Sequence, residues 1–224
     1  MQPHRRCQQE GLKAPESMND LPAGVRLHPG FFDAEAQIAL AREIAAVIAA
    51  APLYTSTMPK TGAPMSVRMT NCGDFGWYSD KSGGYRYEPR HPMTGAPWPP
   101  IPPALLSAWE RLTGFALPPQ ACLVNVYGPE ARMGMHQDRD EKDFDAPILS
   151  VSLGADCRFR VGGRKRADRT TAFVLSSGDA LVFGGPARLC HHGVDKILPT
   201  LPPPLPSELL AGGARINLTL RRVT

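Results

Sequence analysis

Two segments in the first half of the chain show the hydrophobic spacing of amphipathic helices. Residues 33–50 are rich in Ala, Leu, Ile and Glu, lack Gly and Pro, and begin with Asp33, a favoured N-cap residue. Apolar residues recur there every three to four positions, which predicts a helix with one buried stripe packed against a sheet. That stripe consists of Ile38, Ala41, Ala45 and Ile48. A shorter helix is predicted over residues 103–114, opened by Pro103 and closed by Gly114.

From residue 121 onward the pattern changes to short β-like runs separated by turn residues. The seven runs read ACLVNVY, PILSVSLG, CRFRVGG, TAFVLSSGD, ALVFGG, ARLCHHGV and ARINLTLRRV. Short strands at intervals of about eight to twelve residues are typical of an antiparallel sandwich or jelly roll. The sequence therefore predicts helices that back a β-sandwich core, which is an α+β fold.

The stretch from residue 54 to residue 100 is rich in Gly, Pro and aromatic residues and has few helix signals. It holds four of the five tyrosines and two of the three tryptophans. Because long structureless loops are uncommon in compact domains, we expect short strands and loops with a functional role there. A Pro-rich run at residues 199–208 predicts a stiff polyproline-type loop before the last strand.

Length and composition predict one globular domain. The chain has 224 residues, of which 42% are hydrophobic and 21% charged. We expect a single domain over residues 21–224 after a flexible tail over residues 1–20. No apolar run is long enough to span a membrane, the N-terminus lacks a signal peptide, and the five cysteines show no paired spacing, which together favour a cytoplasmic protein with reduced thiols. A net charge of +4 permits nucleic acid as a partner without requiring it.

A candidate metal site lies at His136 and Asp138. Residues two apart in an extended segment project to the same side, so the imidazole and the carboxylate can meet at one point. A third ligand is available from the adjacent histidines His191 and His192. Two histidines and one carboxylate on one face of an ion form the facial triad of non-haem iron(II) oxygenases. Taken alone, however, a His-x-Asp pair is more often a turn or a hydrogen-bonded pair than a ligand set.

The last predicted strand, residues 215–221, alternates strictly between polar and apolar side chains. Its polar face consists of Arg215, Asn217, Thr219 and Arg221. Such a face usually points to water, but two arginines, an amide and a hydroxyl also suit a small dianion, because guanidinium groups pair with carboxylates bidentately. An earlier strand offers Asn125 and Tyr127 side by side on a similar face. A dicarboxylate that chelates the metal at one end and meets an arginine at the other would use both faces.

Together these motifs resemble the AlkB family of iron(II)- and 2-oxoglutarate-dependent dioxygenases. The matching residues are Asn125 and Tyr127 in NxY, His136 to Glu141 in HQDxDE, His192 and Gly193 in HG, and Arg215 to Arg221 in RxNxTxR. The resemblance extends from about residue 21 to residue 222. It implies a double-stranded β-helix (jelly-roll, cupin-like) catalytic core over residues 121–222, with residues 54–100 as a substrate lid over the active site.

The resemblance also implies the roles of the cofactor-binding residues. The implied ligands of Fe(II) are His136, Asp138 and His192. His192 is preferred over His191 because it directly precedes the glycine of the HG pair. Arg215 would bind the distal carboxylate of 2-oxoglutarate, and O2 would be the second cosubstrate. The other residues implied around 2-oxoglutarate are Asn125, Tyr127, Asn217, Thr219 and Arg221, and Arg221 would also be catalytic, beside Asp138 at the iron.

The implied substrate is a nucleobase methylated at a ring nitrogen, which makes the base cationic. A cation favours an aromatic face and a nearby carboxylate, and Trp77 and Asp140 are the candidates for these two roles. Asp140 could instead only help to solvate the acidic loop around it. The candidate substrate-binding residues are Met69, Thr70, Trp77, Tyr85, Asp140 and Arg166, with Tyr87 in the same lid and His136 able to stack on the opposite side of the base.

Basic residues cluster between residues 158 and 169, where the sequence has one acid, Asp168. The cluster consists of Arg158, Arg160, Arg164, Lys165, Arg166 and Arg169. A charge run is usually a solvated face, but the family resemblance favours contact with nucleic-acid phosphates.

The activity implied by the resemblance is DNA repair by oxidative demethylation of 1-methyladenine or 3-methylcytosine in single-stranded or locally melted DNA. The reaction would use Fe(II), 2-oxoglutarate and O2 and release formaldehyde, succinate and CO2. Double-stranded DNA and RNA are further candidate partners, and we expect a monomer with no membrane partner. Two alternatives use the same residues: a related oxygenase that acts on RNA, protein or lipid, and a nonenzymatic nucleic-acid-binding domain with a degenerate metal site.

Overall fold

The computed structural model describes residues 21–199 and 213–224. The tail expected over residues 1–20 and the Pro-rich run after Pro199 lie outside the described residues. The helices in the described part are α1 (Ala34–Ala50), α2 (Pro103–Thr113) and the short 3-10 helix η2 (Gly185–Ala187). The strands are β1 (Val25–His28), β2 (Val67–Gly73), β3 (Gly76–Asp80), β4 (Gly84–Glu88), β5 (Ala121–Tyr127), β6 (Met133–His136), β7 (Ile148–Gly154), β8 (Cys157–Val161), β9 (Thr171–Leu175), β10 (Ala180–Phe183), β11 (His192–Ile197) and β12 (Arg215–Arg221).

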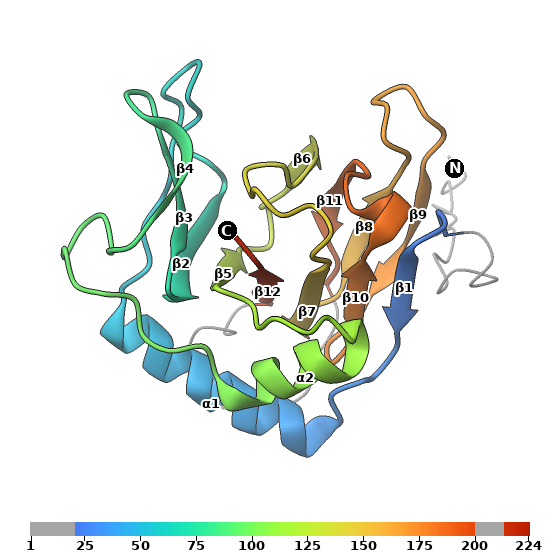
Figure 1. Cartoon of the computed structure of the whole chain (residues 1–224), viewed down its shortest axis with the longest axis horizontal. Helices are drawn as coiled ribbons and strands as arrows, with labels where there is room; N and C mark the ends of the chain where they lie inside the picture. Colours follow the sequence, from blue (N-terminus) through green and yellow to red (C-terminus); the bar gives the residue numbers. More distant parts are fainter. Residues whose placement is uncertain (1–20, 200–212) are drawn as a thin grey trace, which may run out of the picture.

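The strands form two larger sheets and a separate hairpin (Figure 1). The six-stranded sheet has the order β1-β10-β7-β12-β5-β2, and the four-stranded sheet has the order β6-β11-β8-β9. β3 and β4 form a two-stranded sheet beside β2, at the left of Figure 1. Neighbouring strands pair antiparallel in all three sheets. This confirms the predicted α+β fold with antiparallel sheets, as expected for a double-stranded β-helix.

Alternation along the strands gives the six-stranded sheet two different faces. One face is apolar and packs with residues of α1 and α2, which lie along the lower edge of Figure 1; Val124 and Leu218 belong to this cluster. The other face contributes Leu181 and Phe183 to a second apolar cluster, which Phe159 of the four-stranded sheet also joins. The polar positions of β5 and β12 lie on this second face, and they line a cavity.

Helix α1 begins at the predicted N-cap but buries a different stripe. Asp33 accepts a hydrogen bond from the backbone N–H of Ala36 at 2.9 Å. The buried side chains are Gln37, Leu40, Ala41, Ile44 and Val47. The predicted Ile38, Ala45 and Ile48 are half-buried, so the stripe is wrong at these positions. Leu40, Ile44 and Val47 lie at positions i, i+4 and i+7 and form the centre of the buried face, and Ile48 packs partly buried against the same cluster.

Most other predicted elements are confirmed. Helix α2 begins at Pro103, and Gly114 caps it in the left-handed conformation. The run ARLCHHGV is the exception, because only its end, from His192, enters β11, and its start lies at η2. Pro186 in η2 has no backbone N–H with which to join a sheet. The predicted runs omit β1 and β6, which are four residues long each and not continuously apolar, whereas the equally short β10 consists of four buried apolar residues.

The aromatic-rich stretch from residue 54 to residue 100 divides between two sheets. β2 is the edge strand of the six-stranded sheet and pairs with β5, whereas β3 and β4 form the hairpin. Cys72 of β2 lies opposite Cys122 of β5, and all four cysteines of the described residues are free and buried. Neither α-helix in the described part is long and apolar enough to cross a membrane.

Candidate metal centre

Three side chains, from two neighbouring strands and the loop after one of them, meet at one point. His136 ends β6, His192 begins β11, and the two residues pair across these strands; Asp138 follows two positions after β6. One ligand atom from each residue lies within 4.8 Å of the other two. The imidazole Nε2 atoms of His136 and His192 lie 3.7 and 3.6 Å from the Asp138 carboxylate oxygens, too far for hydrogen bonds. The three donors therefore converge without binding one another, as a facial metal site requires.

Both imidazoles turn the same nitrogen toward the metal site. The Nδ1 of His136 lies 2.9 Å from the backbone oxygen of Gly134, and that of His192 lies 3.1 Å from the backbone oxygen of Cys190. A proton on Nδ1 leaves Nε2 as the lone-pair donor. Burial, together with the nearby His136, lowers the pKa of His192 to about 4. His192 is therefore neutral at pH 7, which is the form that binds a metal.

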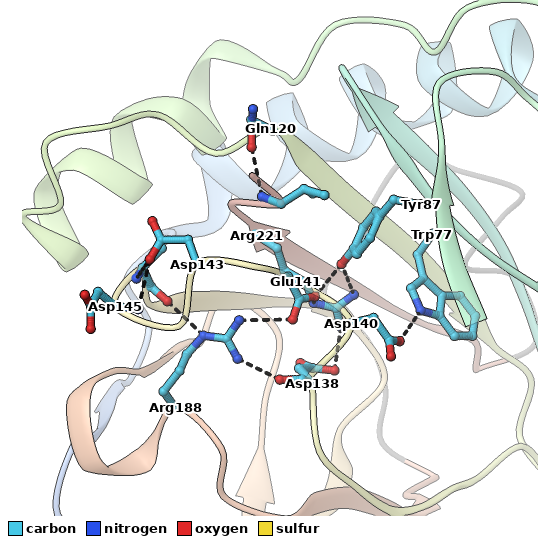
Figure 2. A network of polar contacts seen from close by, with 12 residues as sticks. Trp77, Tyr87, Gln120, Asp138, Asp140, Glu141, Asp143, Asp145, Arg188 and Arg221 are labelled. Carbon is cyan, nitrogen blue, oxygen red and sulfur yellow. Dashed lines mark hydrogen bonds and ion pairs between the residues drawn. The ribbon is translucent and has the colours of Figure 1, made fainter. Parts of the chain in front are cut away.

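Asp138 is buried and ionised. Burial alone would raise the pKa of its carboxyl group, but the positive charge of Arg221 outweighs this and holds the pKa below its usual range. Arg221 Nη2 donates to Asp138 Oδ1 at 2.8 Å, a contact that Figure 2 shows. The other oxygen, Oδ2, has no hydrogen-bond partner among the described residues. An ionised, buried carboxylate with one free oxygen fits a metal ligand.

The polar face of β12 lies inside the molecule rather than in water. Its four side chains line a cavity of about 980 Å³ together with the three metal-ligand residues. Arg215 is 1% exposed; its Nη2 donates to Ser152 Oγ at 2.6 Å, while its Nε has no hydrogen-bond partner in the described part. Asn217 Nδ2 donates to Ser150 Oγ at 2.7 Å and Asn217 Oδ1 accepts from Thr219 Oγ1 at 2.8 Å. A buried arginine with an unused N–H suits an anion.

β5 supplies polar groups beside the same strip. Asn125 pairs with Asn217 across the sheet, and Tyr127 pairs with Arg215. Asn125 Oδ1 is buried without a hydrogen-bond partner among the described residues. The Tyr127 hydroxyl donates to a weak acceptor, the Met133 sulfur, at 3.7 Å. The Tyr127 hydroxyl is thus a donor that the fold leaves incompletely used, and it fits an oxygen of 2-oxoglutarate.

The β3–β4 hairpin brings the candidate substrate residues to the cavity. The rings of Trp77 and Tyr85 stack with centroids 5.5 Å apart, and Trp77 Nε1 donates to Asp140 Oδ2 at 2.8 Å. All three residues line the cavity, as do Met69 and Arg166. Asp140 is therefore more than part of a solvated loop, because its carboxylate fixes the indole.

Two expected lid residues lie elsewhere. Thr70 is fully buried, donates to the backbone oxygen of Ala51 at 2.8 Å and does not line the cavity. Its expected substrate role is corrected for a physical reason: Thr70 follows Met69 on β2, and successive strand residues point to opposite faces. Tyr87 contacts Glu141 and Arg221 instead of lining the cavity.

The basic cluster is partly neutralised by an acid from another strand. Arg160 Nη2 lies 2.6 Å from Asp195 Oδ2 of β11, and Arg158 Nε lies 3.4 Å from the same oxygen. The sequence shows only one acid within the cluster, Asp168. It does not reveal Asp195, because that residue comes from a neighbouring strand. The other four basic residues of the cluster are exposed: Arg164, Lys165, Arg166 and Arg169.

Sequence reasoning missed two buried residues next to the site. Glu141 is 5% exposed and Arg188 is 4% exposed, and they form an ion pair with an Nη2–Oε2 distance of 3.0 Å. Glu141 stands within the motif that includes His136, which is a usable signal. Arg188 has no local signal, because its partners are 42 to 50 positions away along the chain.

Comparisons with known proteins agree with this geometry. The chain matches the 2OG-Fe(II) oxygenase superfamily over residues 24–221. It is 51% identical over 199 residues to an alpha-ketoglutarate-dependent dioxygenase AlkB homolog of Caulobacter vibrioides, covering 89% of this chain and 87% of that protein. It is 40% identical over 187 residues to the alpha-ketoglutarate-dependent dioxygenase AlkB of Escherichia coli, covering 82% and 83%. The solved structure of OsALKBH1 matches with a TM-score of 0.69 at 30% identity, covering 90% of this chain and 99% of that one.

Proposed function

Because the chain belongs to the AlkB family of iron(II)- and 2-oxoglutarate-dependent dioxygenases, we propose that it repairs DNA by oxidative demethylation. The substrates are 1-methyladenine and 3-methylcytosine in single-stranded or locally melted DNA. One observation carries this proposal: the stacked pair Trp77 and Tyr85, anchored through Trp77 to Asp140, lines the same cavity as the metal ligands.

His136, Asp138 and His192 hold the iron(II), and the polar strips of β5 and β12 hold 2-oxoglutarate. When bound, these two cofactors supply the oxidation of the methyl group by O2, with succinate, CO2 and formaldehyde as products. Arg215 binds the distal carboxylate through its unused Nε, and burial strengthens this contact by excluding water. Arg221 keeps Asp138 ionised and oriented toward the metal.

The hairpin supplies the recognition of the damaged base. N-methylation gives the ring a positive charge, and a cation is attracted to the face of an indole and to a carboxylate. Trp77 offers the ring, and Asp140 both offers the charge and holds the indole in place. His136 bounds the cavity as well, so that a base between the two rings would present its methyl group to the metal site.

The exposed basic residues next to the cavity favour a nucleic-acid substrate over a free base. Arg166 lines the cavity, and Arg164 and Lys165 lie beside it in the sequence on the surface. Phosphate contacts of this kind position the strand without reading its sequence. The target base must leave the stack to enter the cavity. The free-energy cost of unpairing and unstacking it is lowest in single-stranded or melted DNA.

The test is release of formaldehyde and succinate by the full chain with iron(II), 2-oxoglutarate and ascorbate. Oligonucleotides of one sequence are compared as DNA and as RNA, each with or without a single 1-methyladenine or 3-methylcytosine. We expect formaldehyde only with the lesion, in a one-to-one ratio with lesion-dependent succinate, and faster with DNA. In Trp77→Ala, loss of stacking of about 1–3 kcal/mol should lower kcat/KM roughly five- to 150-fold.

Trp77→Phe is the matched control, because it keeps an aromatic face but loses part of the stacking area and the N–H bound to Asp140. It should fall between the parent and Trp77→Ala. Succinate without any dependence on the lesion would contradict DNA repair and favour an oxygenase acting on RNA, protein or lipid. If neither product forms, the result favours the alternative of a nonenzymatic nucleic-acid-binding domain with a degenerate metal site.

A further inference from the structure

A buried arginine lies between the two segments that carry the metal ligands. Arg188 follows η2, four positions before His192. Its Nη1 donates to the backbone oxygen of Asp138 at 2.7 Å, and its Nε donates to the backbone oxygen of Ala146 at 2.8 Å. A single guanidinium group therefore contacts both ends of the loop from residue 138 to residue 146, as Figure 2 shows for Asp138.

A second contact between the same two segments runs in the opposite direction. Gln137 Nε2 donates to the backbone oxygen of Leu189 at 2.6 Å. Residues 137 and 138 thus contact residues 189 and 188, next to the strand pairing of His136 with His192. The segments that present the ligands are connected at successive positions, although the metal ligands themselves do not bind one another.

Arg188 also binds Glu141, which is the hub of a buried polar network (Figure 2). Arg188 Nη2 donates to Glu141 Oε2 at 3.0 Å, and the Tyr87 hydroxyl donates to Glu141 Oε1. Arg221 Nε lies 3.5 Å from the same Oε1, while Arg221 Nη2 holds Asp138. Two guanidinium groups thus balance two carboxylates in a buried site, where an uncompensated charge would be costly.

The network reaches the hairpin that carries the substrate wall. Trp77 of β3 and Tyr87 of β4 are direct cross-strand partners. Trp77 binds Asp140, and Tyr87 binds the next residue, Glu141. Consecutive loop residues therefore hold both strands of the hairpin, two and three positions after the metal ligand Asp138.

We propose that Arg188 and Glu141 are positioning residues, which hold Asp138 in its metal-binding orientation and connect it to the β3–β4 hairpin. Neither residue lines the cavity, so both act through Asp138 and Tyr87. The proposal rests on the iron(II) site of the proposed function but not on the identity of the substrate. Outer-shell partners of this kind typically change metal affinity by about 10- to 100-fold when they are replaced.

The experiment measures binding of Mn(II), a stand-in for iron(II) that does not oxidise, to the full metal-free chain with 2-oxoglutarate present. The variants are Glu141→Gln, Arg188→Lys and Tyr87→Phe. The control is Arg86→Met, which removes the ion pairs of Arg86 with Asp80 and Glu88 on the same hairpin, away from the metal ligands. Thermal unfolding of each variant without metal establishes that it is folded.

We expect about 10- to 100-fold weaker Mn(II) binding for Glu141→Gln, since one guanidinium charge is then uncompensated beside the metal site. Tyr87→Phe should weaken binding less, because it removes only one hydroxyl, and Arg86→Met should bind as the parent does. Folded Glu141→Gln and Tyr87→Phe proteins with the parental Mn(II) affinity would overturn the proposal. If Arg188→Lys does not fold, the Mn(II) affinities of Glu141→Gln and Tyr87→Phe still test the proposal.

Amide hydrogen exchange provides a readout that a purely structural role would not change. In the parent, Mn(II) should slow exchange both in residues 138–146 and in the hairpin, because the two are connected. In Tyr87→Phe the slowing in the hairpin should shrink while that in the loop persists. If Mn(II) slows exchange in the hairpin of Tyr87→Phe as much as in the parent, the proposed connection between the loop and the hairpin is wrong. No nucleic acid is present, so a failure of the DNA substrate proposal would appear only in the formaldehyde assay.

Discussion

Both faces of β12 are buried, but one carries apolar side chains and the other carries polar and charged side chains. Toward the helices, Ile216, Leu218 and Leu220 are at most 1% exposed and join an apolar cluster. Toward the cavity, Arg215, Thr219 and Arg221 are at most 7% exposed. Burial of an apolar side chain contributes free energy to folding, whereas burial of a polar group costs free energy unless the group is hydrogen-bonded. One strand therefore carries a stabilising face and a face that stability alone does not explain.

Incomplete hydrogen bonding shows where the second face is used. Asn125 Oδ1, Asp138 Oδ2 and Arg215 Nε are buried atoms without a hydrogen-bond partner among the described residues. All three belong to residues that line the same cavity. Buried polar atoms are nearly always paired in native proteins, so a group of unpaired ones around a cavity marks a ligand site. The helix-facing side stabilises the fold, and we propose that the cavity-facing side binds the cofactors.

The largest expected effect comes from a metal ligand on the cavity side. His192→Ala should reduce 2-oxoglutarate turnover to background, because two remaining ligands do not complete the facial site. The neighbouring His191→Ala should keep Mn(II) binding within a few-fold of the parent. The measurement is succinate release together with Mn(II) affinity for both variants. The reverse result would move the third ligand to His191.

A core substitution on the helix side should have the opposite consequence. Leu218→Ala removes a fully buried side chain and should lower the free energy of unfolding by about 2–5 kcal/mol. The KM for 2-oxoglutarate of the folded protein should stay near the parental value. Urea unfolding and succinate kinetics check the two halves of this prediction. A large change in KM would mean that the two faces are not separable.

The cavity side should also give the metal-free protein a pH dependence. The pKa of His192 is about 4 in the folded state because of burial, against about 6.5 when unfolded. Between these values the unfolded chain binds a proton that the folded chain does not, so stability falls as pH falls. The expected loss from pH 6.5 to pH 4 is up to about 3 kcal/mol. Urea unfolding across this range should show that slope in the parent and in Leu218→Ala, but a smaller one in His192→Gln.

A smaller effect is expected at the far end of the cavity. Arg215→Lys keeps the charge but loses the planar donor set that matches a carboxylate. The lost hydrogen bonding to a charged group corresponds to about 1.5–3 kcal/mol, or roughly a 10- to 150-fold higher KM for 2-oxoglutarate. Metal affinity measured without 2-oxoglutarate should not change. A KM equal to that of the parent would remove Arg215 from the cosubstrate site.

Local patterns were sufficient to predict much of the fold and of the metal site. The alternation in β12 predicts its two faces, and the spacing of His136 and Asp138 predicts a pair of convergent donors. Alternation does not state which face is inside, however, so the polar face of β12 could equally have pointed to water. The same limit explains Thr70, whose side chain lies on the other face of β2 from Met69.

Contacts between segments that are far apart along the chain could not be predicted from the sequence. Arg188 and Glu141 are 47 positions apart, and Asp195 reaches Arg160 across 35 positions. Such pairs depend on strand order and register, which local patterns do not determine. Short elements are similarly hidden, since four residues in β6 show no period even though that strand ends in a metal ligand.

The central claim is that the cavity-facing side of the six-stranded sheet forms one metal and 2-oxoglutarate site. Its most direct test is calorimetric titration of 2-oxoglutarate into the full chain, with and without saturating Mn(II). We predict one 2-oxoglutarate per chain, bound more tightly when Mn(II) is present, with the Mn(II)-dependent gain lost in His192→Ala and the overall affinity reduced in Arg215→Lys. Binding that is unaffected by Mn(II), or a gain that persists in His192→Ala, would contradict the account.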